Sequence, residues 1–251
     1  LFQQSDLVAE FVHELRTPLT AIISYADLQQ RPDMPAAQSR QFAETIQTEA
    51  SRMASIADRF LELARLESGR TQINCDQVDV ATLIRMAVNV VVPQADAAQI
   101  DLQTEVPSGL PAIAGDAQQL HQVMLNLLNN AVKYSAAGDR VTVSAERVNG
   151  EVRVSVADTG PGIPAAAVPH LFKRFYRVHA DDRRVPGVGL GLAITRQIVD
   201  AHRGQPVENG HVAAQQSVAE QRTPGVDQRR RGRILVLERL ARRCAACLRP
   251  L

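Results

Sequence analysis

The chain has 251 residues, of which 45% are hydrophobic, and its formal net charge is +1. This length and composition are ordinary for a soluble protein with a real core, two domains are the better expectation, and no stretch approaches the ~20 apolar residues that cross a bilayer. The charge is uneven, because residues 203–251 hold ten Arg and only four Asp or Glu, which leaves −5 for residues 1–202. An acidic main body argues against nucleic acid as a partner.

The first pattern along the chain is an amphipathic helix with one polar cluster. Its apolar residues recur at spacings of three and four, which predicts one buried and one solvated face. They are Val8, Phe11, Val12, Leu15, Leu19, Ile22, Ile23 and Ala26. His13 lies off this stripe, Thr17 is one turn away on the same side, and Glu14 is an adjacent carboxylate that could accept an imidazole proton. Pro18 should bend the helix just beyond this cluster. Taken alone, an exposed histidine on a helix is usually only solvated.

A second helical pattern runs from about residue 36 to residue 66, and the prolines at 32 and 35 mark a turn between the two helices. We therefore expect an antiparallel hairpin. A hairpin cannot bury a continuous apolar stripe alone, so the sequence favours a homodimer that forms a four-helix bundle. The alternative is that the hairpin docks on a second domain of its own chain.

Short β-like runs alternate with helices beyond residues 68–70, which predicts a domain boundary there. The expected strands are 72–78, 100–106, 140–148 and 151–157, and the expected helices are 81–98, 116–134, 165–175 and 190–202. Asn149 and Gly150 are a strong hairpin signal between the last two strands. This order indicates an α+β protein in which the helical hairpin precedes an α/β sandwich domain with a mixed sheet, covered by helices on one face.

Polar residues on the predicted helix 116–134 could form a ligand site. Asn126, Asn130 and Lys133 follow one another at steps of four and three and therefore share one face. Amide oxygens suit Mg²⁺, and a lysine can offset phosphate charge. Without further context, two asparagines at this spacing more often form a solvated polar face of a helix than a ligand site.

Two glycine-containing segments also suggest ligand binding. Asp158 ends a predicted strand and is followed by a turn with Gly160 and Gly162, where a carboxylate could accept a hydrogen bond from an amino group, although a tight turn alone would look the same. A second segment precedes the last helix and could present backbone N–H groups to phosphates. Its site residues are Gly187, Gly189, Leu190 and Gly191. It lacks the strand–turn–helix context of a dinucleotide fingerprint.

Five strings resemble, in order, the sequence boxes of sensor histidine kinases of two-component systems. They are FVHELRTPLTAI, LNLLNNAVKYS, DTGPGI, LFKRFYR and GVGLGLAI, and the resemblance extends from about Phe11 to His202. It implies a dimerisation and histidine phosphotransfer hairpin at residues 1–68 and a Bergerat-type catalytic ATP-binding domain at residues 69–203.

The resemblance also implies roles for the candidate residues. His13 would attack the γ-phosphate of Mg·ATP, Glu14 would take the ring proton, and Thr17 could orient water in the reverse, phosphatase direction. In the nucleotide site, Asn130 would bind Mg²⁺, Tyr134 would lie beside the base, Asp158 would accept from the adenine amine, and Arg177 would reach the γ-phosphate. The remaining nucleotide-binding candidates are Asn126, Lys133, Gly160, Gly162, Gly187, Gly189, Leu190 and Gly191.

Partners and location follow from the same resemblance. The phosphoryl group would pass to an aspartate in the receiver domain of a response regulator, and the chain would act as a homodimer. Three cysteines, Cys75, Cys244 and Cys247, are too few for a disulfide framework and favour the cytoplasm for the chain as given. Leu1 already lies inside a helical pattern, so we expect an upstream portion, anchored in the inner membrane in the full-length protein.

The tail, residues 204–251, departs from the family pattern. The two final strands of the family are not recognisable, Ile234 to Leu237 is the sole strand-like remnant, and the remainder has the composition of a disordered segment with an uncovered sheet edge left behind it. An altered reading frame after His202 and a real extension both fit. Two other functions therefore stay open: a catalytically impaired dimeric module that binds or dephosphorylates a regulator, and a different ATPase such as a chaperone, against which the phosphoacceptor helix argues.

Overall fold

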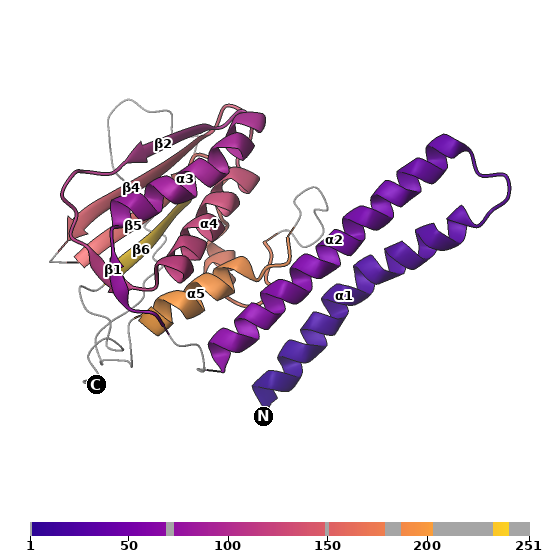
Figure 1. The fold of residues 1–251 in the computed structure, drawn as a ribbon, viewed down its shortest axis with the longest axis horizontal. Coiled ribbons are helices and arrows are strands. Elements are labelled where there is room, and N and C mark those ends of the chain that lie inside the picture. Colours follow the sequence, from indigo (N-terminus) through magenta and orange to yellow (C-terminus); the bar gives the residue numbers. More distant parts are fainter. Residues whose placement is uncertain (1, 69–72, 149–150, 179–186, 203–232, 241–251) are drawn as a thin grey trace.

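The computed structural model describes residues 2–68, 73–148, 151–178, 187–202 and 233–240. Helices α1 (Phe2–Gln29) and α2 (Ala36–Glu67) form a long antiparallel hairpin that projects from an α/β domain (Figure 1). The Phe11 and Phe60 rings stack with their centroids 3.9 Å apart, and the centroids of the Tyr25 and Phe42 rings are 5.2 Å apart. These two aromatic pairs fix the alignment of the helices, and the predicted hairpin is confirmed.

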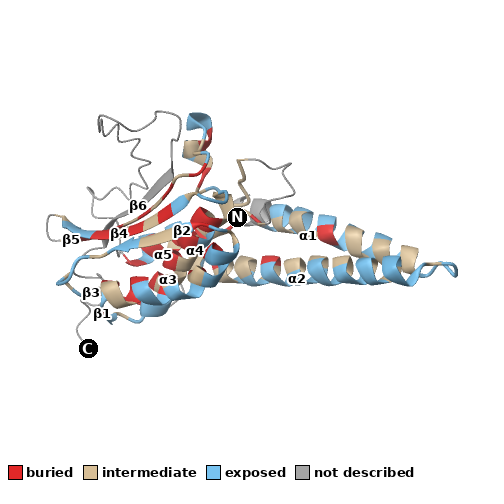
Figure 2. Cartoon of the chain, turned by 90° about the horizontal axis from the view of Figure 1, so that it is seen from above, coloured by how far each residue is buried: buried red, intermediate tan, exposed pale blue. Residues whose placement is uncertain are grey.

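The second domain is built on a four-stranded mixed sheet in the order β2-β4-β5-β6. Its strands are β2 (Asp101–Glu105), β4 (Arg140–Val148), β5 (Glu151–Asp158) and β6 (Arg233–Leu240). β2 and β4 are parallel, and the other pairs are antiparallel. One face of the sheet is covered by α3 (Val80–Ala97), α4 (Ala117–Tyr134) and α5 (Gly191–His202) (Figures 1 and 2). The predicted layering is therefore confirmed.

The alternation of side chains along β5 positions a carboxylate that matters later. Val152, Val154 and Val156 are buried beneath the helices, and the residues between them are only half-buried. Because strand side chains alternate with a period of two, the same parity places Asp158 on the helix-covered face, at the end of the strand. Asp158 is only 6% exposed.

Three local predictions differ from the structure. The strand expected at 72–78 is shorter, β1 (Asp76–Val78), and pairs with β3 (Ile113–Gly115), which was not predicted from the sequence. Strands of three residues are too short to show an alternating pattern. The helix expected at 165–175 is a 3₁₀ helix, η1 (Ala165–His170). Pro169 disfavours a continuous α-helix there, and Phe175 has φ 56°, which is outside the helical region.

Strand β6 changes the expectation of an uncovered sheet edge. It contains the strand-like remnant Ile234 to Leu237 and pairs antiparallel with β5, with Ile234 opposite Ala157 and Leu237 opposite Val154. The edge of β5 is therefore hydrogen-bonded along this stretch. Residues 203–232 and 241–251, the rest of the predicted tail, lie outside the described residues.

A buried histidine that the sequence patterns did not single out connects two helix ends. The Nδ1–H of His202 donates to the Ile198 carbonyl oxygen at 2.8 Å, and Nε2 accepts from the backbone N–H of Asp116 at 2.9 Å. The Asp116 carboxylate in turn caps α4 by accepting from the N–H groups of Gln118 and Gln119. His202 thus joins the C-terminus of α5 to the N-terminus of α4 with both ring nitrogens paired.

Two further observations bear on location. Of the helices that the structure describes, none is both long enough and apolar enough to span a bilayer. Cys75, just before β1, is in a disulfide bond, although the cysteine count favoured free thiols.

Candidate functional site

The polar face of α4 meets the start of α5. Asn126, Asn130 and Lys133 are half-buried, whereas the opposite face of α4 supplies buried apolar residues to the core. The Asn126 side-chain amide donates to the Gly191 carbonyl oxygen at 3.3 Å, although the two residues are far apart in sequence. The predicted asparagine face and the predicted glycine segment therefore lie side by side.

The glycine segment, residues 187–191, is packed against two other parts of the domain. The ammonium group of Lys133 lies against Gly187, in the space that a Cβ would occupy. Gly189 has φ 75°, and a Cβ there would come within 2.6 Å of the Phe175 backbone. Only glycine combines this positive φ with so close an approach of two backbones. Phe175 and Gly189 therefore form a backbone contact, which we call the 175/189 contact.

Replacing Gly189 with alanine is expected to disturb the site more than the same change at Gly138. Both glycines have positive φ, 75° and 84°, so both substitutions carry a similar backbone penalty of about 1 kcal/mol. A Cβ on Gly138 would meet no described atom within 4 Å, whereas a Cβ on Gly189 would meet Phe175. We expect Gly189→Ala to unfold at clearly lower urea concentration than Gly138→Ala and to bind ATP more weakly. Equal urea midpoints and equal ATP affinities for the two variants would contradict the close packing of Gly189 on Phe175.

Asp158 is held in place by its own turn and by the end of α4. One carboxylate oxygen, Oδ1, accepts from the backbone N–H of Gly160 at 3.0 Å. A Cβ on Gly160 would lie 3.0 Å from the carbonyl oxygen of Tyr134, so this turn packs directly on the last residue of α4. Gly162, with φ 74°, continues the turn. The structure thus brings Asp158, Gly160 and Tyr134 together.

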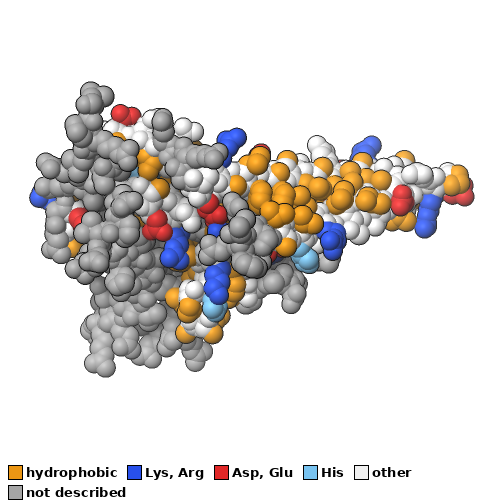
Figure 3. Space-filling view, turned by 90° about the horizontal axis from the view of Figure 1, so that it is seen from below, with side chains coloured by type: hydrophobic (Ala, Val, Ile, Leu, Met, Phe, Trp, Pro, Cys, Tyr) orange, Lys and Arg blue, Asp and Glu red, His pale blue; other side chains and the backbone are white. Residues whose placement is uncertain are grey.

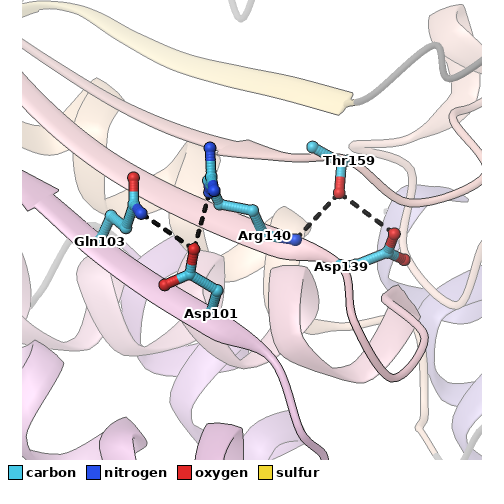
Figure 4. A network of polar contacts seen from close by, with 5 residues as sticks. All are labelled: Asp101, Gln103, Asp139, Arg140 and Thr159. Atoms are coloured by element: carbon cyan, nitrogen blue, oxygen red, sulfur yellow. Dashed lines mark hydrogen bonds and ion pairs between the residues drawn. The ribbon is translucent and has the colours of Figure 1, made fainter.

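A hydrogen-bond network fixes the strand ends beside Asp158 (Figure 4). The Thr159 hydroxyl donates to Asp139 Oδ1 at 3.1 Å and accepts from the Arg140 backbone N–H at 2.9 Å. The Arg140 side chain then donates through Nε to Asp101 Oδ2 at 2.8 Å, and Gln103 donates to the same oxygen at 2.9 Å. Because Thr159 follows Asp158 directly, this network holds the backbone that carries the buried carboxylate.

Positive charge gathers beside the glycine segment. The pKa of Lys133 is lowered to about 8, first because its amine is partly buried and then because the Arg177 and Arg59 guanidinium groups lie nearby. Lys133 also sits 4.8 Å above the centre of the Tyr134 ring. We call Lys133, Arg177 and Arg59 the cation cluster. Cations that disfavour one another in this way suit a polyanionic ligand, which would relieve their repulsion.

The hairpin candidates lie on α1, whose neighbouring residues Phe11 and Leu15 pack against the core of the second domain. His13 and Thr17 are exposed on α1, Glu14 is half-buried, and Pro18 is buried within the helix. The structure therefore leaves His13 exposed on the helical hairpin.

Two residues near the site were not predicted from the sequence to belong there. Arg59 belongs to α2, yet its Nη1 lies 3.8 Å from the position of a Cβ on Gly191. Ile56 and Leu63, three residues before and four residues after Arg59, are fully buried in the structure, but no local sequence pattern marks Arg59 as a site residue. Phe175 belongs to the string LFKRFYR, and its positive φ had no sequence signal.

Comparison with known families matches both parts of the chain. Residues 3–69 match the His Kinase A (phospho-acceptor) domain, and residues 115–228 match the histidine kinase-, DNA gyrase B- and HSP90-like ATPase. The second match continues beyond His202, where the resemblance noted from the sequence ended.

Individual relatives extend this similarity. The sensor protein DivL of Caulobacter vibrioides is 34% identical over 79% of this chain and 25% of its own length. The adaptive-response sensory kinase SasA of a Synechococcus species is 34% identical over 79% of this chain and 54% of its own length. The chain thus spans between a quarter and about half of these curated relatives.

Solved structures share the fold. Full-length ShkA in complex with AMPPNP superposes with a TM-score of 0.57 at 30% identity, covering 79% of this chain and 41% of that one. Histidine kinase ThkA in complex with the response regulator protein TrrA superposes with a TM-score of 0.67 at 20% identity, covering 92% of this chain and 60% of that one. At that identity the ThkA similarity concerns the fold.

Proposed function

This chain belongs to the sensor histidine kinase family, and on that premise we propose that it transfers the γ-phosphoryl group of ATP to His13 and from there to an aspartate of a response regulator. The observation that supports this most directly is the cation cluster beside the glycine segment, opposite a buried carboxylate at a strand end. The phospho-acceptor match over residues 3–69 favours a kinase over the other ATPases that share the second family model.

Adenosine triphosphate fits the chemistry of the described residues. Asp158 would accept from the adenine amine, and the Tyr134 ring would lie beside the base. Lys133 and Arg177 would bind the phosphates together with backbone N–H groups of Gly187, Gly189, Leu190 and Gly191. The Asn126 side chain donates to Gly191 of this segment, and Asn130, one turn further along α4, offers the hard oxygen that Mg²⁺ prefers. Bound Mg²⁺ would neutralise charge on the triphosphate. The related full-length ShkA was solved in complex with AMPPNP, a triphosphate analogue.

In the proposed reaction, neutral His13 attacks the γ-phosphorus in line. A nitrogen–phosphorus bond forms as the bond to the β-phosphate oxygen breaks and ADP leaves, while Glu14 accepts the ring proton. Lys133 and Arg177 stabilise charge on the transferring group. Thr17 is placed one turn from His13, where it would orient water for hydrolysis of a phosphorylated regulator. The exposed position of His13 requires that the hairpin and an ATP-binding domain approach each other during transfer.

We further propose that two copies of the hairpin pair as a four-helix bundle. Large apolar side chains on the hairpin remain 44–53% exposed, at spacings of four and seven on α1 (Figure 3). They are Val8, Val12, Leu19, Ile23 and Leu61. The other side of α2 docks on the ATP-binding domain through Ile56 and Leu63, so the expected dimer surface and the intrachain docking surface are different faces of the same hairpin.

The proposal is tested by labelling the chain with ATP carrying label at the γ or the α position, in the presence of Mg²⁺. We expect label only from the γ position, stable in alkali and lost in acid, and transferable to a purified receiver domain. Label that resists acid, or equal label from both positions, would contradict the proposal. ATP binding without labelling would instead favour the catalytically impaired module.

ATP affinity is expected to fall as the pH rises above 8. In the free chain Lys133 loses its proton around pH 8, and bound phosphates favour the charged amine, so they raise its pKa. Above pH 8, binding must therefore take up a proton, which weakens the affinity by up to about tenfold for each pH unit until the pKa of the complex is reached.

Calorimetric titrations between pH 6.5 and 9.5 measure this dependence. Lys133→Arg is expected to remove most of it, since arginine stays charged throughout. Lys173→Arg, at the only other lysine of the chain, is the matched control and should keep the wild-type profile. A wild-type affinity that is constant up to pH 9.5 would show that Lys133 does not bind the phosphates.

A further inference from the structure

Helix α2 is part of the hairpin, but one of its faces belongs to the core of the second domain. Ile56 and Leu63 are fully buried within the same hydrophobic cluster as Leu190 and Ile194. These two α2 residues are seven apart, so they lie on one side of the helix, and Arg59 falls between them on that side. The docked face therefore includes a guanidinium group that is half-buried.

Two polar contacts on the C-terminal side of Arg59 strengthen this docking. Glu67 forms an ion pair with Arg174, in the segment between η1 and the glycine segment. Glu62 is hydrogen-bonded to the side chain of Gln122 on α4. Burial raises the pKa of Glu62, while Gln122 and the nearby Arg59 lower it in part. The end of α2 is thus attached to α4, to α5 and to the segment around Phe175.

Arg59 reaches the nucleotide side of this interface. Its Nη1 lies 3.8 Å from the Cβ position of Gly191, the first residue of α5, where helix N–H groups lack helical partners. Its charge also contributes to the lowered pKa of Lys133. A guanidinium with five donors at this point is well suited to bind phosphate oxygens.

We propose that Arg59, carried by the helical hairpin, is a ligand for the terminal phosphates of the nucleotide bound at the glycine segment. This inference rests on the proposed ATP site. It makes the site a composite of two domains, so a bound triphosphate stabilises the docking of α2, and docking tightens triphosphate binding by the same factor. Loss of the terminal phosphate on transfer to histidine removes part of this attraction and favours release of the hairpin.

The test is calorimetric titration of the full chain with Mg·ATP, Mg·ADP and AMP. Arg59→Gln is expected to weaken ATP affinity at least about fivefold and ADP affinity by a smaller factor. The affinity for AMP should stay unchanged within experimental error, because only the outer phosphates contact the guanidinium. Arg40→Gln is the matched control: it makes the same charge change on an exposed residue of α2 and should leave all three affinities unchanged. Arg59→Lys, which keeps the charge, should give an intermediate ATP affinity.

A second readout follows docking itself. In the wild-type chain, ATP is expected to slow backbone hydrogen exchange at residues 56–67 more than AMP does, and Arg59→Gln should abolish this difference. Equal ATP affinity in wild type and Arg59→Gln, with the same exchange protection, would overturn the role of Arg59 while leaving the ATP site intact. A wild-type chain that bound none of the three nucleotides would overturn the site and this inference together.

Discussion

A His13→Gln chain is expected to incorporate no acid-labile phosphate from γ-labelled ATP, whereas its affinity for ATP should equal that of the wild type. Glutamine has no ring nitrogen that can attack phosphorus, so the nitrogen–phosphorus bond cannot form. His13 is exposed on α1 and is not among the residues proposed to bind the nucleotide, so nucleotide binding should not depend on it. Labelling and calorimetry on the same preparation measure both quantities.

The control for this experiment is His121→Gln on α4, a half-buried histidine with no proposed role. It should label at the wild-type rate. Glu14→Gln should label about 10²- to 10⁴-fold more slowly, the usual contribution of a general base. Undiminished labelling of His13→Gln, or loss of labelling in both histidine variants, would show that another residue is the phosphoacceptor.

Asp158→Asn is expected to weaken ATP binding by about 10- to 150-fold, the range of one hydrogen bond to a charged group, 1.5–3 kcal/mol. The carboxylate lies at a buried strand end, where one oxygen already accepts from Gly160. An amide in its place presents a donor as well as an acceptor and therefore matches the adenine amine poorly. The same change should reduce the preference for ATP over GTP.

Asp101→Asn provides the comparison for Asp158→Asn. Asp101 belongs to the network that supports this strand end, but its side chain is half exposed and pairs with Arg140. Its substitution should change ATP affinity less than threefold, because exposed ion pairs contribute little. Thermal melts show whether either variant is folded. If both variants bound ATP as the wild type does, the base would not lie against Asp158.

Helices and their faces could be predicted from the sequence because each helix is long enough for its pattern of apolar and polar residues to repeat several times. The stripe on α1, the polar face with Asn126 and Lys133, and the strand ending in Asp158 all follow from local spacing. The adjacency of Asn126 to Gly191, and of Tyr134 to Gly160, could not be predicted in this way, since it depends on how α4 packs beside α5 and β5. Only the resemblance to a known family indicated that these residues belong to one site.

Other features had no local signal at all. Arg59 is separated from the glycine segment by about half of the chain, and the packing of Ile56 and Leu63 into the core of the second domain brings it there. The short strands β1 and β3 are defined by pairing with each other rather than by pattern. Sequence patterns left dimerisation and intrachain docking as alternatives. The structure shows that docking uses one face of α2 and leaves an apolar stripe exposed, so the two are compatible.

The 175/189 contact has a consequence for how related chains can vary. Because Phe175 and Gly189 touch through their backbones, the chain between them starts and finishes at one point of the domain. Lengthening such a connection costs little, roughly 0.6 kcal/mol for each doubling, and shifts neither anchor. Insertions and deletions between Arg177 and Gly187, the two proposed phosphate-binding residues of this interval, should therefore be tolerated, while α5 keeps its position relative to α4. Natural variation in length is expected to concentrate between these two residues.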